Sequence, residues 1–217
     1  MAVFPAPWGA GENTAVFHTL REEGGRMSSS FFAYIFRMRY IARWALMRNT
    51  RTENVEEHSY EVAVLAHALA VVGQQVFHKE VDPERVATAA LFHDAPEIIT
   101  GDLPTPIKYF NPHIKSAYDQ VEAVAQDKLL TMLPPELAGA YGPLLRVEEP
   151  QVRRYVKAAD KLAAWLKCLE ERKAGNREFV QAEEETLRTL QAMEMEEVTW
   201  FLEHMGEAFG LTLDELG

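Results

Sequence analysis

Cysteine and long apolar runs are scarce in this sequence of 217 residues. The single cysteine, Cys168, cannot form an internal disulfide bond, and it provides neither a zinc-finger framework nor a CxxC redox pair. The longest nearly apolar run, residues 62–72, contains His67 and is shorter than the roughly 18 to 20 residues of a membrane span. The first residues lack the basic start and apolar stretch of a secretory signal. We therefore expect a cytoplasmic protein without a transmembrane helix.

Positive charge is also in short supply, except in one segment. The chain has 22 Lys and Arg against 33 Asp and Glu, which gives a formal net charge of -11 at pH 7. Such a chain repels nucleic acid and anionic membranes on average, so neither is an expected partner. Residues 31–52, here called the cationic segment, contain no acidic residue. They form either a solvated helix face or a pocket for a small anion such as a phosphate group. The arginines of this segment are Arg37, Arg39, Arg43, Arg48 and Arg51.

The composition, 47% hydrophobic and 25% charged, is that of a globular protein with a proper core. Residues 1–26 are interrupted by Gly and Pro and show no sustained helical period. We expect them to be a dispensable N-terminal extension, and we place one domain at residues 27–217. Translation beginning at Met27 is an alternative interpretation of the same pattern.

Helix signals dominate the expected domain, and no segment alternates as a strand does. Asn54, Asp82 and Asn111 stand at positions typical of N-caps, and Pro follows the last two. Gly73 is expected to end a helix, and residues 100–106, with two prolines and a glycine, to form an ordered loop or turn. The sequence predicts an all-α fold. The expected helices cover residues 31–47, 55–72, 83–93, 112–132, a short stretch after 134, 150–174 and 177–205.

Two histidines and two acids fall on the expected inward faces of these helices. His58 precedes Val62 and Leu65 by four and seven residues, so its imidazole lies on the apolar stripe. The same spacing places His93 on the buried stripe of its helix, with Asp94 beside it, and Asp160 on a partly apolar face. An unpaired buried carboxylate would cost several kcal/mol. A divalent metal would compensate these carboxylates and use the imidazole lone pairs.

This order of residues resembles the HD-domain metal-dependent phosphohydrolases, in which an inward His, a His-Asp pair and a later Asp bind the metal. The likeness covers residues 28–217 and is closest to the bacterial 5'-deoxynucleotidase branch. It implies an HD-domain helical bundle, commonly a homodimer, that hydrolyses deoxyribonucleoside 5'-monophosphates. It also implies one divalent metal held by His58, His93, Asp94 and Asp160. The motifs that carry the likeness are Arg43-Trp44, residues 51–59, His93-Asp-Ala-Pro-Glu97, Thr100-Gly-Asp-Leu-Pro-Thr-Pro106 and Lys157-Ala-Ala-Asp160.

The resemblance assigns Arg43 to the phosphate, Trp44 to the sugar, and Glu97 and Asp102 to catalysis or substrate positioning. The residues alone support these roles unequally. Arg43 belongs to the cationic segment, as binding of an anion requires. Trp44 is equally typical of a core aromatic, and Asp102 of a turn. The role of Glu97 rests on the family motif alone. Its spacing of four residues from His93 does not place both on one helix face, because Pro96 disfavours helix at the preceding residue.

The expected donor set of two imidazoles and two carboxylates suits six-coordinate Mn, Co, Ni, Fe or Mg better than a closed structural zinc site. We expect in-line attack of water on phosphorus, with Arg43 and the metal countering the charge on the phosphoryl oxygens. Two alternatives stay open. One is another HD-family hydrolase, a nucleoside triphosphohydrolase or a cyclic-nucleotide phosphodiesterase. The other is a non-catalytic, metal-dependent nucleotide-binding module.

Overall fold

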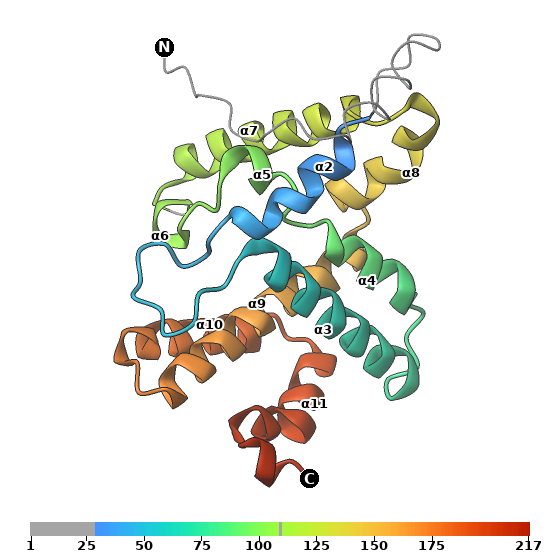
Figure 1. Ribbon diagram of the computed structural model, residues 1–217. Helices are drawn as coiled ribbons and strands as arrows, with labels where there is room; N and C mark the ends of the chain where they lie inside the picture. Colours follow the sequence, from blue (N-terminus) through green and yellow to red (C-terminus); the bar gives the residue numbers. More distant parts are fainter. Residues whose placement is uncertain (1–28, 109) are drawn as a thin grey trace, which may run out of the picture.

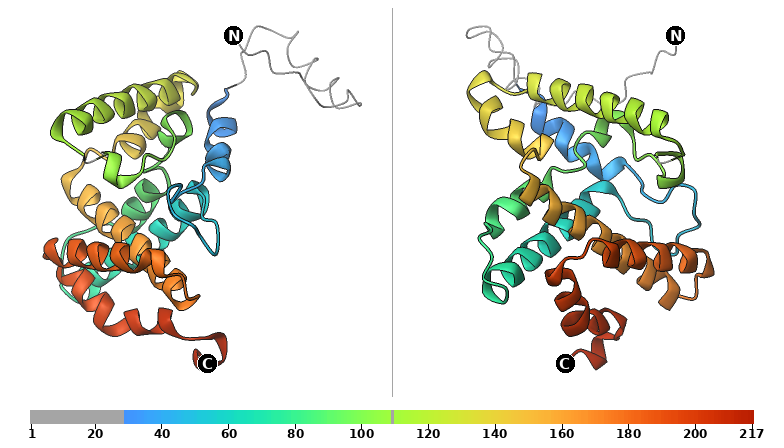
Figure 2. Two further views of the ribbon diagram at one scale, coloured as in Figure 1. Left: turned by 90° about the vertical axis from the view of Figure 1, so that its left-hand side faces the viewer. Right: turned by 180° about the vertical axis from the view of Figure 1, so that it is seen from behind.

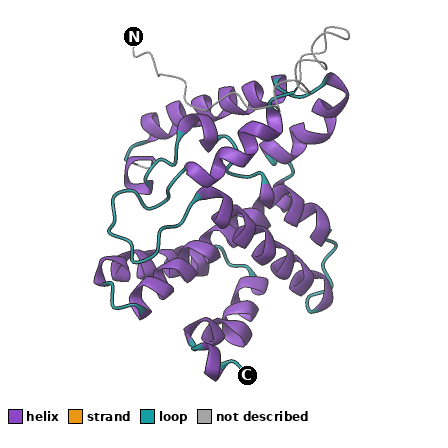
Figure 3. Cartoon of the chain, in the orientation of Figure 1, coloured by secondary structure: helices purple, strands orange, loops and turns teal. Residues whose placement is uncertain are grey.

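The computed structural model describes residues 29–108 and 110–217, and all structural statements below refer to these residues. The expectation for residues 1–26 lies outside them. The described chain is built of helices and loops, with no strand (Figures 1 and 3). The all-α prediction is confirmed. The helices are α2 (Phe31–Ile35), η1 (Phe36–Tyr40), α3 (Val55–Gln75), α4 (Pro83–Leu91), α5 (Glu97–Thr100), α6 (Thr105–Lys108), α7 (Pro112–Thr131), α8 (Pro135–Arg146), α9 (Pro150–Lys173), η2 (Arg177–Phe179), α10 (Val180–Ala192), α11 (Glu196–Met205), η3 (Gly206–Gly210) and η4 (Leu213–Glu215).

The predicted N-caps begin the helices as expected. The side chain of Asn54 accepts a hydrogen bond from the backbone N–H of Glu57 at 3.0 Å. Asp82 and Asn111 cap α4 and α7 in the same way, and each is followed by a proline at the first helical position. Each cap satisfies one of the backbone N–H groups that a helix start leaves without a partner. These helix starts are therefore fixed by local sequence.

The core consists of two apolar clusters on either side of the first turns of α3. The larger cluster joins α3, α4, α9 and α11 and includes Val62, and the smaller one includes Val55 and Ala95. His58 lies between Val55 and Val62 along α3, and its side chain is fully buried. Figures 1 and 2 show α7 and α8 at one end of the molecule and α11 with the C-terminus at the other. Among the described helices, none is both long and apolar enough to cross a membrane.

The expected helix over residues 31–47 is wrong beyond Tyr40. The chain leaves η1 in an extended conformation, and Ala42 forms an antiparallel bridge with Asn54. The backbone N–H of Arg43 donates to the carbonyl of Glu53 at 2.9 Å, which closes residues 41–54 into a loop. The cationic segment therefore is not one helix face. The backbone groups of Ile41 and Arg43 pair with Val55 and Glu53, which lie beyond the segment, and a helical period cannot reveal such pairs.

Gly73 does not end its helix as expected, because α3 continues to Gln75. A Cβ atom at this position would lie 2.5 Å from the hydroxyl oxygen of Tyr155. That hydroxyl donates to Glu197 at 2.5 Å, and Lys79 lies 2.9 Å from the same carboxylate oxygen. The glycine thus allows a close approach between α3, α9 and α11 instead of a helix stop.

Gly73→Ala is expected to lower the free energy of unfolding by about 2–4 kcal/mol, because the new methyl group displaces the Tyr155 hydroxyl from Glu197. Chemical denaturation measures the change. Gly139→Ala is the matched control, since Gly139 is helical and a Cβ there meets nothing within 4 Å. That control should gain about 0.5–1 kcal/mol from helix propensity. Equal stability of the two variants would contradict the role of Gly73.

The expected last helix, 177–205, is also interrupted. It divides into η2, α10 and α11, with a break at residues 193–195. Glu194 takes a left-handed conformation with φ 48°, and the guanidinium of Arg154 donates to the carbonyls of Met193 and Glu194. Arg154 lies on α9, so the break depends on a partner that is distant in sequence.

Candidate active site

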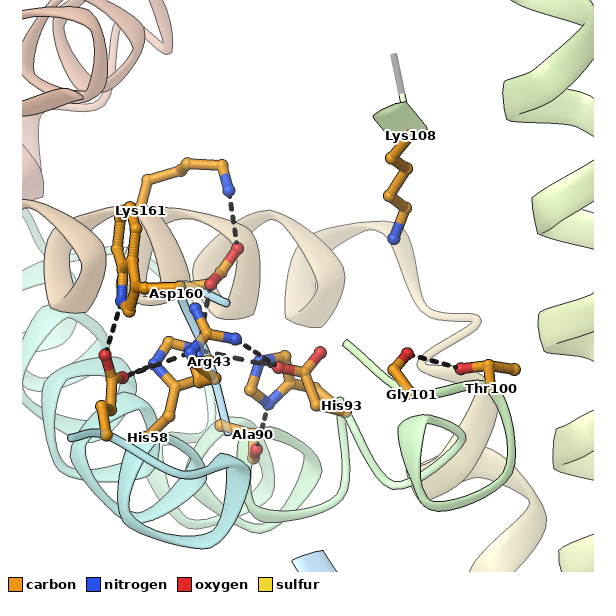
Figure 4. Close-up of polar contacts among 12 residues, drawn as sticks. Arg43, His58, Ala90, His93, Thr100, Gly101, Lys108, Asp160 and Lys161 are labelled. Carbon is orange, nitrogen blue, oxygen red and sulfur yellow. Dashed lines mark hydrogen bonds and ion pairs between the residues drawn. The ribbon is translucent and has the colours of Figure 1, made fainter. Parts of the chain in front are cut away.

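Three of the four predicted metal ligands, His58 of α3, His93 after α4 and Asp160 of α9, lie close together (Figure 4). His58, His93 and Asp160 each offer one ligand atom, and these atoms lie within 4.8 Å of one another. Asp94 is next to them, with Oδ2 3.1 Å from His93 Nε2 and 3.7 Å from His58 Nε2. His58 is fully buried and its Nε2 lies 3.1 Å from Asp160 Oδ1. We call these four residues the ligand group.

His93 reaches the ligand group from a turn and not from a helix stripe, so that part of the prediction is wrong. Helix α4 ends at Leu91, and His93 and Asp94 lie in the turn before α5. Within this turn, the backbone N–H of His93 donates to Ala90. The side chain is also held there, because its Nδ1 lies 2.7 Å from the Ala90 carbonyl oxygen. Nδ1 is therefore the protonated nitrogen, and the lone pair of Nε2 faces the ligand group.

The ligand group fits a divalent metal by its chemistry. His93 Nε2 is buried and has no hydrogen bond of acceptable geometry, which leaves its lone pair available. Although burial alone would raise the pKa of both acids, positive charge that includes Arg43 holds the pKa of Asp94 below its ordinary value, and Lys161 does the same for Asp160. Two imidazoles and two anionic carboxylates are the donor set that a divalent transition metal takes.

Arg43 is the member of the cationic segment that reaches this group. Its side chain is 12% exposed, and its Nη1 lies 3.4 Å from Asp94 Oδ2. The side chains of Arg39 and Arg51 instead form exposed ion pairs with Glu56 and Glu170. The interpretation as one solvated helix face is therefore wrong, and the interpretation as a pocket for a small anion stays a prediction. Arg43 lies at the candidate site, while Arg37, Arg39, Arg48 and Arg51 are exposed.

Trp44 adopts a left-handed backbone conformation, with φ 58°. This region is unfavourable for a bulky residue and persists only when surrounding contacts hold it. The indole Nε1–H donates to Glu53 Oε2 at 2.7 Å, and the ring packs against Phe179 with centroids 5.3 Å apart. Trp44 is thus half-buried against Glu53 and Phe179 rather than part of either apolar cluster.

Glu53 is a buried acid that sequence reasoning missed. Its Oε1 lies 3.1 Å from His58 Nδ1 and 3.2 Å from Arg43 Nε, as ion-pair contacts whose angles are not those of hydrogen bonds. Although burial alone would raise it, contacts with His58, Arg43 and Trp44 hold the pKa of Glu53 below its ordinary value. One signal pointed to it: Glu53 is the first acid after the acid-free segment. It is therefore the nearest partner along the chain for a buried arginine.

Glu97 and Asp102 are two further acids whose pKa values are affected by the charge of Asp94. Glu97 begins α5, its backbone N–H donates to Asp94, and its Oε2 is buried without a hydrogen-bond partner. Burial, together with the negative charges of Asp94 and Asp102, raises the pKa of Glu97 to about 10. Burial also raises the pKa of Asp102, with Arg43 opposing this rise. Both acids are thus within electrostatic range of the ligand group.

Glu171, a second acid missed in the sequence, anchors the loop that carries Arg43 and Trp44. Its buried carboxylate accepts from the backbone N–H and hydroxyl of Thr50, at 2.9 and 2.7 Å, and from the backbone N–H of Arg51 at 3.2 Å. Lys167, one turn earlier on α9, donates to the same carboxylate at 2.5 Å. Burial would raise the pKa of Glu171, but these donors hold it well below its ordinary value. The loop is therefore tied to α9 by a charged group.

Comparison with known proteins decides the family. Residues 30–209 match the family described as 5'-deoxynucleotidase YfbR-like. The chain belongs to this family. It is 48% identical over 190 residues to a 5'-deoxynucleotidase of Cronobacter sakazakii, which covers 87% of this chain and 96% of that protein. The 5'-deoxynucleotidase YfbR of Escherichia coli is 47% identical over 190 residues, with the same coverage.

Solved structures support the same fold. An HD-domain phosphohydrolase from Listeria innocua superposes with a TM-score of 0.73 at 24% identity, covering 83% of this chain and 88% of that one. The HD phosphohydrolase of cyanophage S-2L, whose structure holds dA and one catalytic Zn2+ ion, has a TM-score of 0.59 at 21% identity. It covers 81% of this chain and 96% of that one. The expected HD-domain helical bundle is confirmed.

Proposed function

We propose that this 5'-deoxynucleotidase hydrolyses deoxyribonucleoside 5'-monophosphates to deoxyribonucleoside and phosphate at the ligand group. The observation that carries the proposal is the convergence of His58, His93 and Asp160 within 4.8 Å, with Arg43 beside Asp94. A divalent metal held by the ligand group would supply Lewis-acid activation of water and of the phosphoryl group. The proposed metals are Mn, Co, Ni, Fe or Mg.

Arg43 binds the phosphate in this proposal. Its guanidinium is nearly buried in a chain of net charge -11, so it is a fixed positive group where an anion must arrive. A planar guanidinium can hold two phosphoryl oxygens and stabilise the charge they gain during in-line attack. Its pairing with Glu53 and Asp94 holds the side chain in place before substrate arrives.

Glu97 and Asp102 handle protons in this proposal. The Oε2 atom of Glu97 is buried and unpartnered, which leaves it free to meet a group of the substrate. One of the two acids takes a proton from water, and the other gives one to the leaving 5'-oxygen. Replacement of either should lower kcat more than it raises KM, because each acts during bond breaking.

Phosphate release from a panel of nucleotides tests the function. The panel contains ribo- and deoxyribonucleotides with one, two or three phosphates, and cyclic nucleotides, each assayed with several divalent metals. We expect release from deoxyribonucleoside 5'-monophosphates above all others. Faster hydrolysis of triphosphates or cyclic nucleotides would favour the other HD hydrolases. Nucleotide binding without any release would favour the non-catalytic module.

Trp44 is proposed to exclude ribonucleotides, because it follows the phosphate-binding Arg43 directly and its indole donates to Glu53, which also contacts Arg43 and His58. An apolar wall discriminates against an added hydroxyl by roughly a hundredfold. We expect Trp44→Ala to lower the ratio of kcat/KM for dAMP over AMP by about tenfold or more. Trp200→Ala is the matched control, since Trp200 stacks on His204 in α11, outside the ligand group. An unchanged ratio in a folded Trp44→Ala enzyme would contradict this role.

Two further expectations concern the whole chain and stay predictions. One is that the protein forms a homodimer. The other is that the domain at residues 27–217 keeps its activity when residues 1–26 are removed.

A further inference from the structure

One carboxylate touches three residues to which the proposed function gives three different roles. Glu53 Oε1 contacts His58 Nδ1 and Arg43 Nε at 3.1 and 3.2 Å. Glu53 Oε2 accepts the indole N–H of Trp44 at 2.7 Å. Both oxygens are therefore engaged, and the residue is only 7% exposed.

The backbone brings these groups together before any side chain is placed. Ala42 pairs with Asn54 across the antiparallel bridge, and the N–H of Arg43 donates to the carbonyl of Glu53. Asn54 caps α3, so Glu53 sits directly before the helix whose second turn carries His58. The position of Glu53 is thus fixed on both sides, by the bridge and by the helix cap.

We propose that Glu53 is a positioning residue that couples metal affinity to discrimination between deoxyribose and ribose. This inference rests on the proposed function. With a metal at the ligand group, the Glu53 carboxylate, 3.1 Å from His58 Nδ1, would favour the proton on that nitrogen and leave the Nε2 lone pair to the metal, as outer carboxylates do for metal-binding histidines. Through Oε2 it fixes the Trp44 indole, whose backbone adopts a strained left-handed conformation, in the orientation that the proposed contact with the sugar requires.

A purely structural role would be limited to compensating the charge of buried Arg43. Such a role predicts lower stability alone. The positioning role predicts two further effects, one on binding of a metal without substrate and one on the choice between sugars. Gln is the informative replacement, because its amide group presents N–H donors where Glu53 offers an acceptor. Its single carbonyl oxygen cannot accept from Trp44 and at the same time face the N–H groups of His58 and Arg43.

The first experiment titrates Co2+ alone into metal-free parent, Glu53→Gln and Glu57→Gln proteins. Glu57 is the matched control, since it is an exposed acid in the first turn of α3. We expect Glu53→Gln to bind Co2+ at least tenfold more weakly, and Glu57→Gln to bind it like the parent. Parent-like Co2+ affinity in a folded Glu53→Gln protein would overturn the metal part of the proposal.

The second experiment compares kcat/KM for dAMP and AMP. We expect the deoxy-to-ribo ratio to fall at least threefold in Glu53→Gln. Trp44→Phe removes the N–H that Glu53 accepts and keeps a smaller aromatic ring, so it gives the answer even if Glu53→Gln does not fold. It should lower the same ratio while leaving Co2+ affinity unchanged. An unchanged ratio in Trp44→Phe would overturn the coupling to the sugar.

The two experiments separate this inference from the proposed function. If the parent protein releases no phosphate from dAMP, the proposed function fails. The Co2+ titration needs no substrate and still decides whether Glu53 acts on the ligand group.

Discussion

Asp160→Ala and His93→Ala are each expected to remove the bound divalent metal and to lower kcat/KM for dAMP about a thousandfold or more. Each variant deletes one of the three atoms that lie within 4.8 Å of one another, and the remaining donors cannot complete the ligand group. Loss of metal activation worth about 4 kcal/mol corresponds to this factor. Elemental analysis of the purified proteins and steady-state kinetics measure the two effects.

Asp119→Ala is the matched control for this prediction, because Asp119 is a surface acid that pairs with Lys115 on α7. It should keep the metal content and the activity of the parent. Circular dichroism must show that the ligand variants are folded. A folded His93→Ala or Asp160→Ala protein with as much metal as the parent would show that the ligand assignment is wrong.

Arg43→Ala is expected to lower kcat/KM about a thousandfold for dAMP and AMP alike, because both carry the phosphate that Arg43 binds. The variant also leaves Glu53 and Asp94 without their shared cation, so it should be destabilised by about 3–5 kcal/mol. Arg43→Lys is therefore the sharper test. It keeps the charge but loses the planar fork, and we expect a loss of about 10- to 100-fold with a smaller loss of stability.

Inhibition by inorganic phosphate tests the proposed contact between Arg43 and the phosphate group directly. Both Arg43 variants should be inhibited more weakly than the parent, while Arg48→Ala, which removes an exposed arginine of the same segment, should be inhibited like the parent. Parent-level kcat/KM and phosphate inhibition in a folded Arg43→Lys enzyme would contradict phosphate binding by Arg43.

Local sequence sufficed to predict the features that depend on near neighbours. Asn54, Asp82 and Asn111 cap helices through N–H groups three residues away, and the inward position of His58 followed from its spacing to Val62. The convergence of the ligand group was also expected, although His93 reaches it from a turn. Helical spacing placed His93 inward, but the hydrogen bonds to Ala90 that set its direction were not visible in the pattern.

Features that depend on distant partners could not be predicted. The cationic segment has a helical period, but its backbone pairs with Glu53, so it forms a loop after Tyr40. Glycine is a residue that commonly ends helices. At position 73 it instead leaves room for the hydroxyl of Tyr155, which lies on another helix. In the sequence, little distinguishes Glu53 and Glu171 from surface acids. Their hydrogen-bond donors are brought to them only by the fold. In each case the deciding contact is made in three dimensions, while the pattern records only neighbours along the chain.

The anchoring of the site loop by Glu171 has a consequence for synthesis of the protein. Thr50 and Glu171 are 121 positions apart, and Asp160 also lies on α9. A nascent chain that has emerged only as far as α8 carries Arg43, His58 and His93. It still lacks the carboxylate of Asp160 and the loop anchor Glu171, which both lie on α9. Contacts of such long range are slow to form because a large loop must close first. Premature termination before α9 should therefore yield an inactive, protease-sensitive fragment, and catalytic competence should arise only when the last third of the chain folds back onto the first.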